Sequence, residues 1–140
     1  MKKKIEGLLC IGIMIIISMA IPISADENDT TLEIVDINGG LGGVTVDVKN
    51  KGSAVATKIT MTTTIQGGIL NGIDLTHFCG GCSDCGETLA PGSIKTENTL
   101  EAGLVFGFGP VQIHCVADAD NANEVSADAT GFIIGPLIII

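Results

Sequence analysis

Beyond residue 30 the chain alternates apolar and polar positions with a period of two, which is the period of a half-buried β-strand. In ITMTTTIQ, residues 59–66, one face carries Ile59, Met61, Thr63 and Ile65, while the other carries threonines and a glutamine. β-Branched residues such as these pack well on a pleated surface. The same alternation marks three further segments: VTVDVKN (44–50), VQIHCVA (111–117) and EVSADAT (124–130). Each of these segments predicts a strand with one face toward a core.

The segments between the predicted strands are rich in glycine, asparagine, aspartate and proline, which favour turns. They read NGGLGG, NKGS, QGG, APGS, FGFGP and DADNANE. No segment after residue 30 has the pattern of a capped amphipathic helix. About seven short strands separated by turns predict an all-β protein, namely an immunoglobulin-like antiparallel β-sandwich.

The first 25 residues have the pattern of a secretory signal peptide. A basic MKKK start is followed by an apolar stretch at 7–21 and then by small residues before an acidic run. We expect cleavage after Ala25, with Ala20 as a second candidate, and an uncleaved membrane anchor is the alternative. The predicted organisation is therefore a signal peptide helix at 1–25, an acidic linker at 26–30 and one sandwich domain at 31–140. This places the protein outside the cell or at its surface.

The chain is strongly acidic, with a formal net charge of −9 at pH 7. Removal of residues 1–25 would make it more acidic, because that segment carries three of its seven lysines. The chain contains no arginine, the residue that best forms paired hydrogen bonds to carboxylates and phosphates. Nucleic acids require clustered lysine and arginine. The sequence therefore disfavours nucleic acid and anionic membranes as partners, with membrane contact only through an uncleaved N-terminal segment.

Three landmarks of the chain are similar to those of one known family. They are the strand, turn and strand of VTVDVKNKGSAVATKIT, the turn of LAPGSIKTENTL and the closing hairpin of VQIHCVADADNANEVSAD. Together they resemble the cell-adhesion-related domain found in bacteria, an immunoglobulin-like module of bacterial and archaeal surface proteins. The resemblance covers about residues 31–130 and implies a seven-stranded sandwich on or outside the cell, without a catalytic residue. The cysteines and the closing GFIIGPLIII depart from the family pattern.

The stretch HFCGGCSDC, residues 77–85, gathers Cys79, Cys82 and Cys85, and Cys115 lies on a predicted strand. Disulfides persist in exported proteins, so these four cysteines predict two bridges in one of three pairings. Each bridge would stabilise the fold by ~2–4 kcal/mol through its restriction of the unfolded chain.

A metal site is the alternative for the same cysteines. Zinc accepts four cysteines, or three with a histidine, and the candidate histidines are His77 and His114. The spacing also resembles the start of an iron–sulfur site, but Thr88 stands where the fourth ligand is expected. A redox Cys-x-x-Cys motif is disfavoured because the chain lacks a βαβ pattern. His114 should point away from Cys115, because neighbours on a strand face opposite sides, so a nucleophile–base pair is also disfavoured.

The turn DADNANE is a second candidate metal site. Its oxygen ligands for calcium would be Asp118, Asp120, Asn123 and Glu124. The spacing departs from that of an EF-hand, and a polar hairpin turn explains these residues without an ion. The favoured interpretation is therefore that the protein holds no cofactor, with zinc or calcium as the alternatives.

The closing GFIIGPLIII is too short to span a bilayer as a helix and predicts a last strand from Phe132. We expect its end to lie against the domain or a neighbouring copy, because a run as apolar as LIII promotes self-association when it is left exposed. No paired-carboxylate site is evident, and the Gly-x-Gly patterns have no following helix, so the sequence disfavours an enzyme. It predicts an exported structural or adhesion-type binding module whose partner is a surface protein or a glycan. A metal-binding or thiol-redox protein is the alternative.

Overall fold

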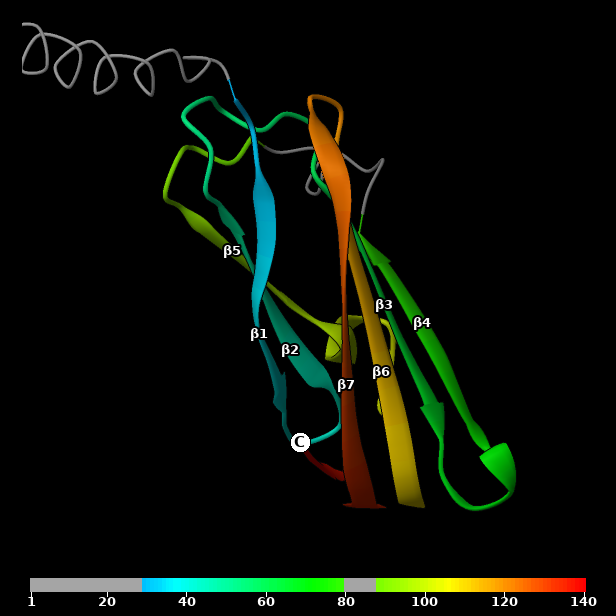
Figure 1. Cartoon of the computed structure of the whole chain (residues 1–140). Coiled ribbons are helices and arrows are strands. Elements are labelled where there is room, and N and C mark those ends of the chain that lie inside the picture. The colour runs from blue at the N-terminus through cyan, green and yellow to red at the C-terminus, as the bar shows by residue number, and fades with distance from the viewer. Residues whose placement is uncertain (1–28, 80–87) are drawn as a thin grey trace, which may run out of the picture.

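The computed structural model describes residues 29–79 and 88–140, which form two antiparallel β-sheets (Figure 1). One sheet has the strand order β1-β2-β5, and the other has the order β4-β3-β6-β7-β8. The strands are β1 (Leu32–Gly39), β2 (Val44–Asn50), β3 (Thr60–Gly67), β4 (Ile73–Cys79), β5 (Ile94–Asn98), β6 (Gly107–Ala119), β7 (Ala122–Gly135) and β8 (Leu137–Ile139). The prediction of an all-β antiparallel sandwich is confirmed, with eight strands in the described residues rather than about seven.

Helical structure within the described residues is confined to two single turns of 3₁₀ helix, η2 (Ile69–Asn71) and η3 (Thr99–Glu101). No helix there has the length and apolarity needed to cross a membrane. The predicted signal peptide, with its candidate cleavage sites at Ala20 and Ala25, lies outside the described residues.

Period-two alternation correctly identifies the residues that face the core. Val44, Val46 and Val48 on β2 are at most 1% exposed, and the inward side chains of β3 and β6 are buried to a similar degree. β7 differs, because Val125 and Ala129 are only partly buried. The cause is the position of β7 near the edge of its sheet. The strand that packs against it from the other sheet is β1, which is itself an edge strand.

The folded domain begins earlier than the predicted boundary at residue 31. The carbonyl oxygen of Asp29 accepts hydrogen bonds from the backbone N–H groups of Ser53 (2.7 Å) and Ala54 (3.1 Å). Thr30 is only 8% exposed. Residues 29 and 30 therefore belong to the sandwich rather than to the predicted linker.

The C-terminal apolar run forms two strands where the sequence predicts one. Phe132 lies within β7, and the chain reverses at Pro136 into β8, which pairs with the end of β7. Ile138 is 2% exposed, and its N–H donates to the carbonyl of Gly40 (3.0 Å). The backbone of β8 passes so close to Gly39 and Gly131 that a Cβ at either position would collide with it.

β4 and β5 are the outer strands on one side of the sandwich, each at the edge of its own sheet. The sulfur of Cys79, at the end of β4, lies 3.4 Å from a carboxylate oxygen of Glu97 on β5. Side chains from the two sheets therefore meet here without backbone pairing between the strands. We call this region the β4–β5 side.

Candidate functional site

The structure separates Cys115 from the cysteine stretch. Cys115 is a free thiol on β6, faces the core and is 1% exposed. Burial raises the pKa of this thiol above its ordinary value, with Asp128 adding to the rise and a hydrogen bond with Thr63 opposing it. The prediction that Cys115 joins a disulfide is therefore wrong.

Cys79 is buried at the end of β4, with 4% of its surface exposed. Cys82 and Cys85 lie outside the described residues. The pairing of Cys79 with either cysteine stays a prediction.

The two histidines lie on opposite faces of the five-stranded sheet. His77 on β4 faces inward, opposite Thr63 on β3, and is 9% exposed. β3 separates it from Cys115 on β6, which corresponds to two strand spacings of ~5 Å each. His114 faces outward, as predicted, and its Nδ1 lies 2.6 Å from Oδ1 of Asp128. The sheet therefore keeps both histidines away from the Cys115 thiol.

The aspartate-rich turn has structural roles that require no ion. Asp118 lies in β6 and accepts a hydrogen bond from the N–H of Ala119, while Asp120 pairs with Lys58 at 3.2 Å. Asn123 and Glu124 lie on β7 beyond the turn and are exposed. Among the described residues, these carboxylates do not converge as a set of three metal ligands. The structure therefore gives the predicted calcium site no support.

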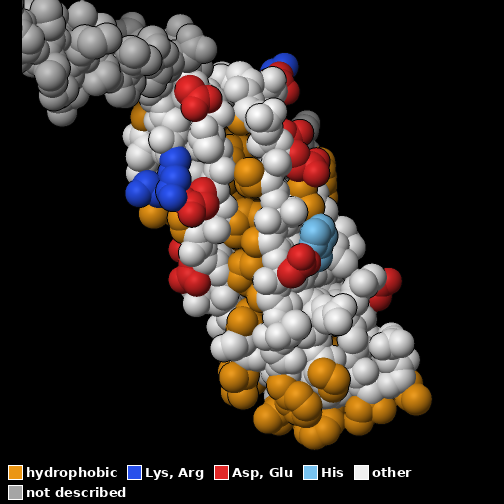
Figure 2. Space-filling model, viewed as in Figure 1, with side chains coloured by type: hydrophobic (Ala, Val, Ile, Leu, Met, Phe, Trp, Pro, Cys, Tyr) orange, Lys and Arg blue, Asp and Glu red, His pale blue; other side chains and the backbone are white. Residues whose placement is uncertain are grey.

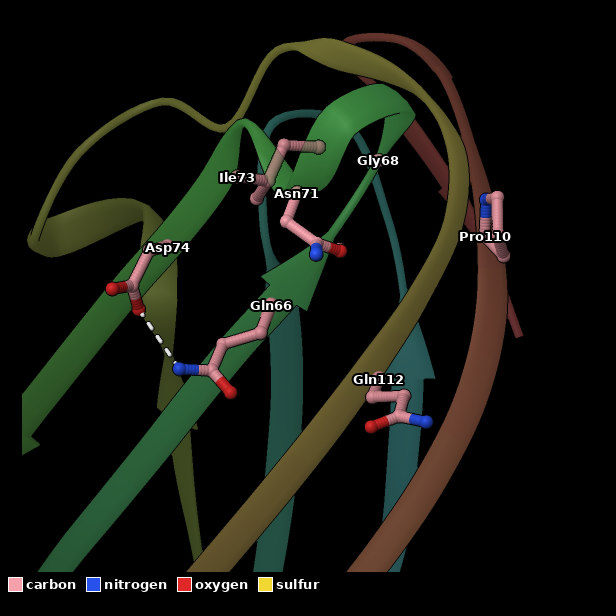
Figure 3. Close-up of a pocket in the computed structure, with 8 residues that line it drawn as sticks. Gln66, Gly68, Asn71, Ile73, Asp74, Pro110 and Gln112 are labelled. Carbon is pink, nitrogen blue, oxygen red and sulfur yellow. Dashed lines mark hydrogen bonds between the residues drawn. The ribbon is translucent and has the colours of Figure 1, made fainter.

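The outer face of the five-stranded sheet carries a shallow hollow of about 490 Å³ near the turn between β3 and β4 (Figure 3). Its polar lining consists of the amides of Gln66, Asn71 and Gln112 and the carboxylate of Asp74. Gln66 donates a hydrogen bond from Nε2 to Oδ1 of Asp74 (3.2 Å). Gln66 and Gln112 are direct cross-strand partners on β3 and β6. Rigid neighbouring strands therefore hold these amides at fixed spacing.

A second hollow of about 250 Å³ shares Gln66 and Gln112 with the first and extends along the same face. It adds Thr64, His114 and Asp128 to the lining. These three residues are of the types found in hydrolytic triads. The hydroxyl of Thr64, however, pairs with that of Thr76 at 3.4 Å, and the His114–Asp128 pair is largely exposed to solvent. The arrangement is suited to hydrogen bonding with a ligand.

We call the two hollows together the polar face. The polar face cannot be recognised from the sequence pattern alone, because outward positions of a strand are polar whether or not they bind a ligand. The available signal was the repeated choice of an amide, Gln66 and Gln112, at outward positions of two strands that the hydrophobic pattern already identified.

Hydrophobic side chains gather at the end of the molecule where the chain terminates, at the bottom of Figure 2. We call this region the apolar end, and its exposed members are Leu41, Ile69, Leu70, Leu104, Phe106, Phe108, Phe132, Ile134, Leu137, Ile139 and Ile140. Phe108 and Phe132 meet edge to face, with ring centroids 5.2 Å apart. The predicted LIII run supplies only part of this surface, because Ile138 is buried.

Comparison with known proteins does not identify a family. The chain matches no protein-family model, and a search of curated proteins finds no significant match. The resemblance to the cell-adhesion-related domain therefore stays a prediction. The fold defines the protein as an all-β sandwich, and its function has to be argued from its own surfaces.

Proposed function

We propose that the protein is an exported, non-catalytic binding module of the cell surface that holds a glycan on its polar face. The observation that carries this proposal is the set of outward amides from Gln66, Gln112 and Asn71 beside the carboxylate of Asp74. An amide offers both donors and acceptors, and a carboxylate offers acceptors, so together they complement the hydroxyl groups of a sugar.

The chemistry of the polar face favours a glycan over a protein partner. The cores of protein interfaces are enriched in aromatic residues, methionine and arginine, and the lining of the polar face contains none of these. Its apolar lining consists of small or aliphatic residues, among them Ile73 and Pro110 in the first hollow and Ile113 and Ala129 in the second. Phe78 lies on the same face of β4 as Asp74 and is 61% exposed. Its ring is one on which a sugar can stack.

Screening of the purified protein against an array of neutral and acidic glycans tests this proposal. For a glycan that binds, we expect Gln66→Ala and Gln112→Ala each to weaken binding by roughly threefold to tenfold, the value of one or two hydrogen bonds. Asn38→Ala is a matched control, because Asn38 is also an exposed amide that donates to a carboxylate, that of Asp36 (2.8 Å), but lies on the other sheet.

Binding that is unchanged in both glutamine variants would contradict the assignment of the polar face. If no glycan binds and a cell-surface protein is captured instead through the same glutamines, the partner is a protein. In either case the variants must melt at the wild-type temperature, so that a loss of binding is not a loss of folding.

Self-association is a second candidate function, favoured by the apolar end. Leu70 is 95% exposed, and Leu70 and Asn71 both adopt positive φ angles, 60° and 52°, that non-glycine residues rarely take. A large apolar side chain held in solvent on a strained turn is typical of a contact surface rather than of a free one. We expect Leu70→Lys to increase the monomer fraction in sedimentation experiments.

Val55→Lys is the control for this experiment. Val55 is exposed (44%) and lies before β3, whereas Leu70 follows it. A wild-type protein that stays monomeric at high concentration would rule out this second function. Deletion of residues 137–140 is a less specific test, because it also removes the buried Ile138.

A further inference from the structure

The β4–β5 side holds a cluster of potential metal ligands that the proposed glycan binding does not use. It consists of His77 on β4, Glu97 on β5 and Glu101 at the end of η3. One ring nitrogen of His77 and one carboxylate oxygen from each glutamate all lie within 4.8 Å of one another. His77 belongs to the five-stranded sheet and Glu97 to the three-stranded sheet.

The backbone that carries the two glutamates is firmly held. Alternation along β5 turns Glu97 toward the interior, where only 13% of its side chain is exposed. Asn98 then caps η3 by accepting a hydrogen bond from the N–H of Leu100 (2.9 Å). Thr99 is buried, and its hydroxyl accepts a hydrogen bond from the N–H of Val44 at the start of β2 (2.8 Å). Glu101 therefore extends from an anchored turn.

His77 provides an independent sign that a ligand is missing. Its Nε2 is buried and has no hydrogen-bond partner among the described residues, although His77 as a whole is 9% exposed. A buried polar atom without a partner is costly, and such atoms are rare in native proteins. The two nearby carboxylates also repel each other, and the ammonium of Lys95, 3.4 Å from Oε1 of Glu97, offsets only one negative charge. A divalent cation would satisfy the histidine and both carboxylates.

We propose that His77, Glu97 and Glu101 bind one divalent transition-metal ion, which links the edge strand of one sheet to the edge strand of the other. One imidazole and two carboxylates suit zinc, cobalt or manganese, whereas calcium takes oxygen ligands. The inference is independent of the proposed glycan binding. It also differs from the zinc site expected from the cysteine stretch, since its ligands are two glutamates and one histidine.

Cobalt titration of the purified full chain tests the site, because cobalt reports the identity of its ligands. Nitrogen and oxygen ligands give only weak visible bands, whereas a thiolate adds an intense band in the near ultraviolet. We expect one equivalent of Co²⁺ to bind without the thiolate band. At a hundredfold excess over Kd, the melting temperature should rise on the order of 10 °C.

The decisive variant is Glu101→Gln, because Glu101 is exposed and its replacement should not disturb the fold. We expect Co²⁺ affinity to fall at least tenfold in Glu101→Gln and in Glu97→Gln. In the control Glu124→Gln, which replaces an exposed glutamate on β7, the affinity should stay within twofold of wild type.

Lys95→Met distinguishes a metal site from a simple ion pair. Because Lys95 competes with the metal for Glu97, its removal should tighten Co²⁺ binding and enlarge the rise in melting temperature. A variant that melts lower than wild type and gains nothing from Co²⁺ would show that the cluster is only an ion pair. Three results would each overturn the proposal: absence of binding at millimolar Co²⁺, a thiolate band, or a Co²⁺ affinity in Glu97→Gln and Glu101→Gln that equals that of the wild type.

Discussion

Asn50, at the end of β2, connects two turns that are far apart in the sequence. Its side chain is fully buried. The Nδ2 group donates to the carbonyls of Ala54 (2.8 Å) and Leu89 (2.9 Å), and Oδ1 accepts from the N–H of Gly52 (2.9 Å). The backbone of Asn50 also accepts a hydrogen bond from Gly92. One buried amide therefore fixes both the turn after β2 and the turn before β5.

Replacement of Asn50 with alanine removes all three side-chain hydrogen bonds. The carbonyl of Leu89 keeps a second donor, the N–H of Ala56 at 2.9 Å, whereas Ala54 and Gly52 lose the partners described above. Each unsatisfied group costs about 1–3 kcal/mol when buried, and less here because both residues are half-buried. We therefore expect Asn50→Ala to lower the free energy of unfolding by about 2–4 kcal/mol, which corresponds to a fall in Tm of roughly 10–20 °C.

Denaturant unfolding at constant pH measures this loss as a lower midpoint with an unchanged slope. Asn50→Asp has nearly the same shape but cannot donate to the two carbonyls, so it should be at least as unstable at pH 7. Asn38→Ala removes an exposed amide and should stay within about 0.5 kcal/mol of wild type. If Asn50→Ala also stays within that range, the hydrogen bonds of Asn50 do not secure the two turns and the reasoning fails.

Two further predictions concern Cys115 and β8. The Cys115 thiol should react with a thiol reagent only on unfolding, and because its pKa is raised in the folded state, stability should fall as the pH rises above about 9. The decline should be shallower in Cys115→Ala, and equal slopes would show that this thiol does not contribute. Gly131→Ala should displace β8 and raise amide exchange at Leu137–Ile139, whereas Gly40→Ala, whose added Cβ meets only an ordinary contact, should not. Unchanged exchange in Gly131→Ala would show that β8 has room to move.

The strands were predictable because each lies with one face on the core. Burial of that face requires apolar residues at every second position of the sequence. β2, β3 and β6 therefore follow directly from VTVDVKN, ITMTTTIQ and VQIHCVA. The division of the C-terminal run into β7 and β8 did not follow, because every residue there except the glycines and Pro136 is apolar. The reversal depends on the space that Gly39 and Gly131 provide, and that is a tertiary relationship.

The error at Cys115 has a physical cause. The number of cysteines and the expected compartment favour disulfides, but they do not say which sulfurs can meet. β3 lies between the strands that carry Cys79 and Cys115. The candidate metal cluster could not be predicted from the sequence for a related reason. His77 and Glu97 belong to different sheets and meet only where the edges of those sheets adjoin.

The short turn η2 joins the two surfaces to which functions are proposed. Asn71 lines the polar face, while Leu70, its neighbour, belongs to the apolar end. Association of two copies through Leu70 would therefore bring the second copy beside the hollow in which a glycan is proposed to bind. The two activities should then affect each other: glycan affinity should depend on protein concentration in the wild type and become independent of it in Leu70→Lys. If the affinity depends on concentration equally in both proteins, η2 does not connect the two surfaces.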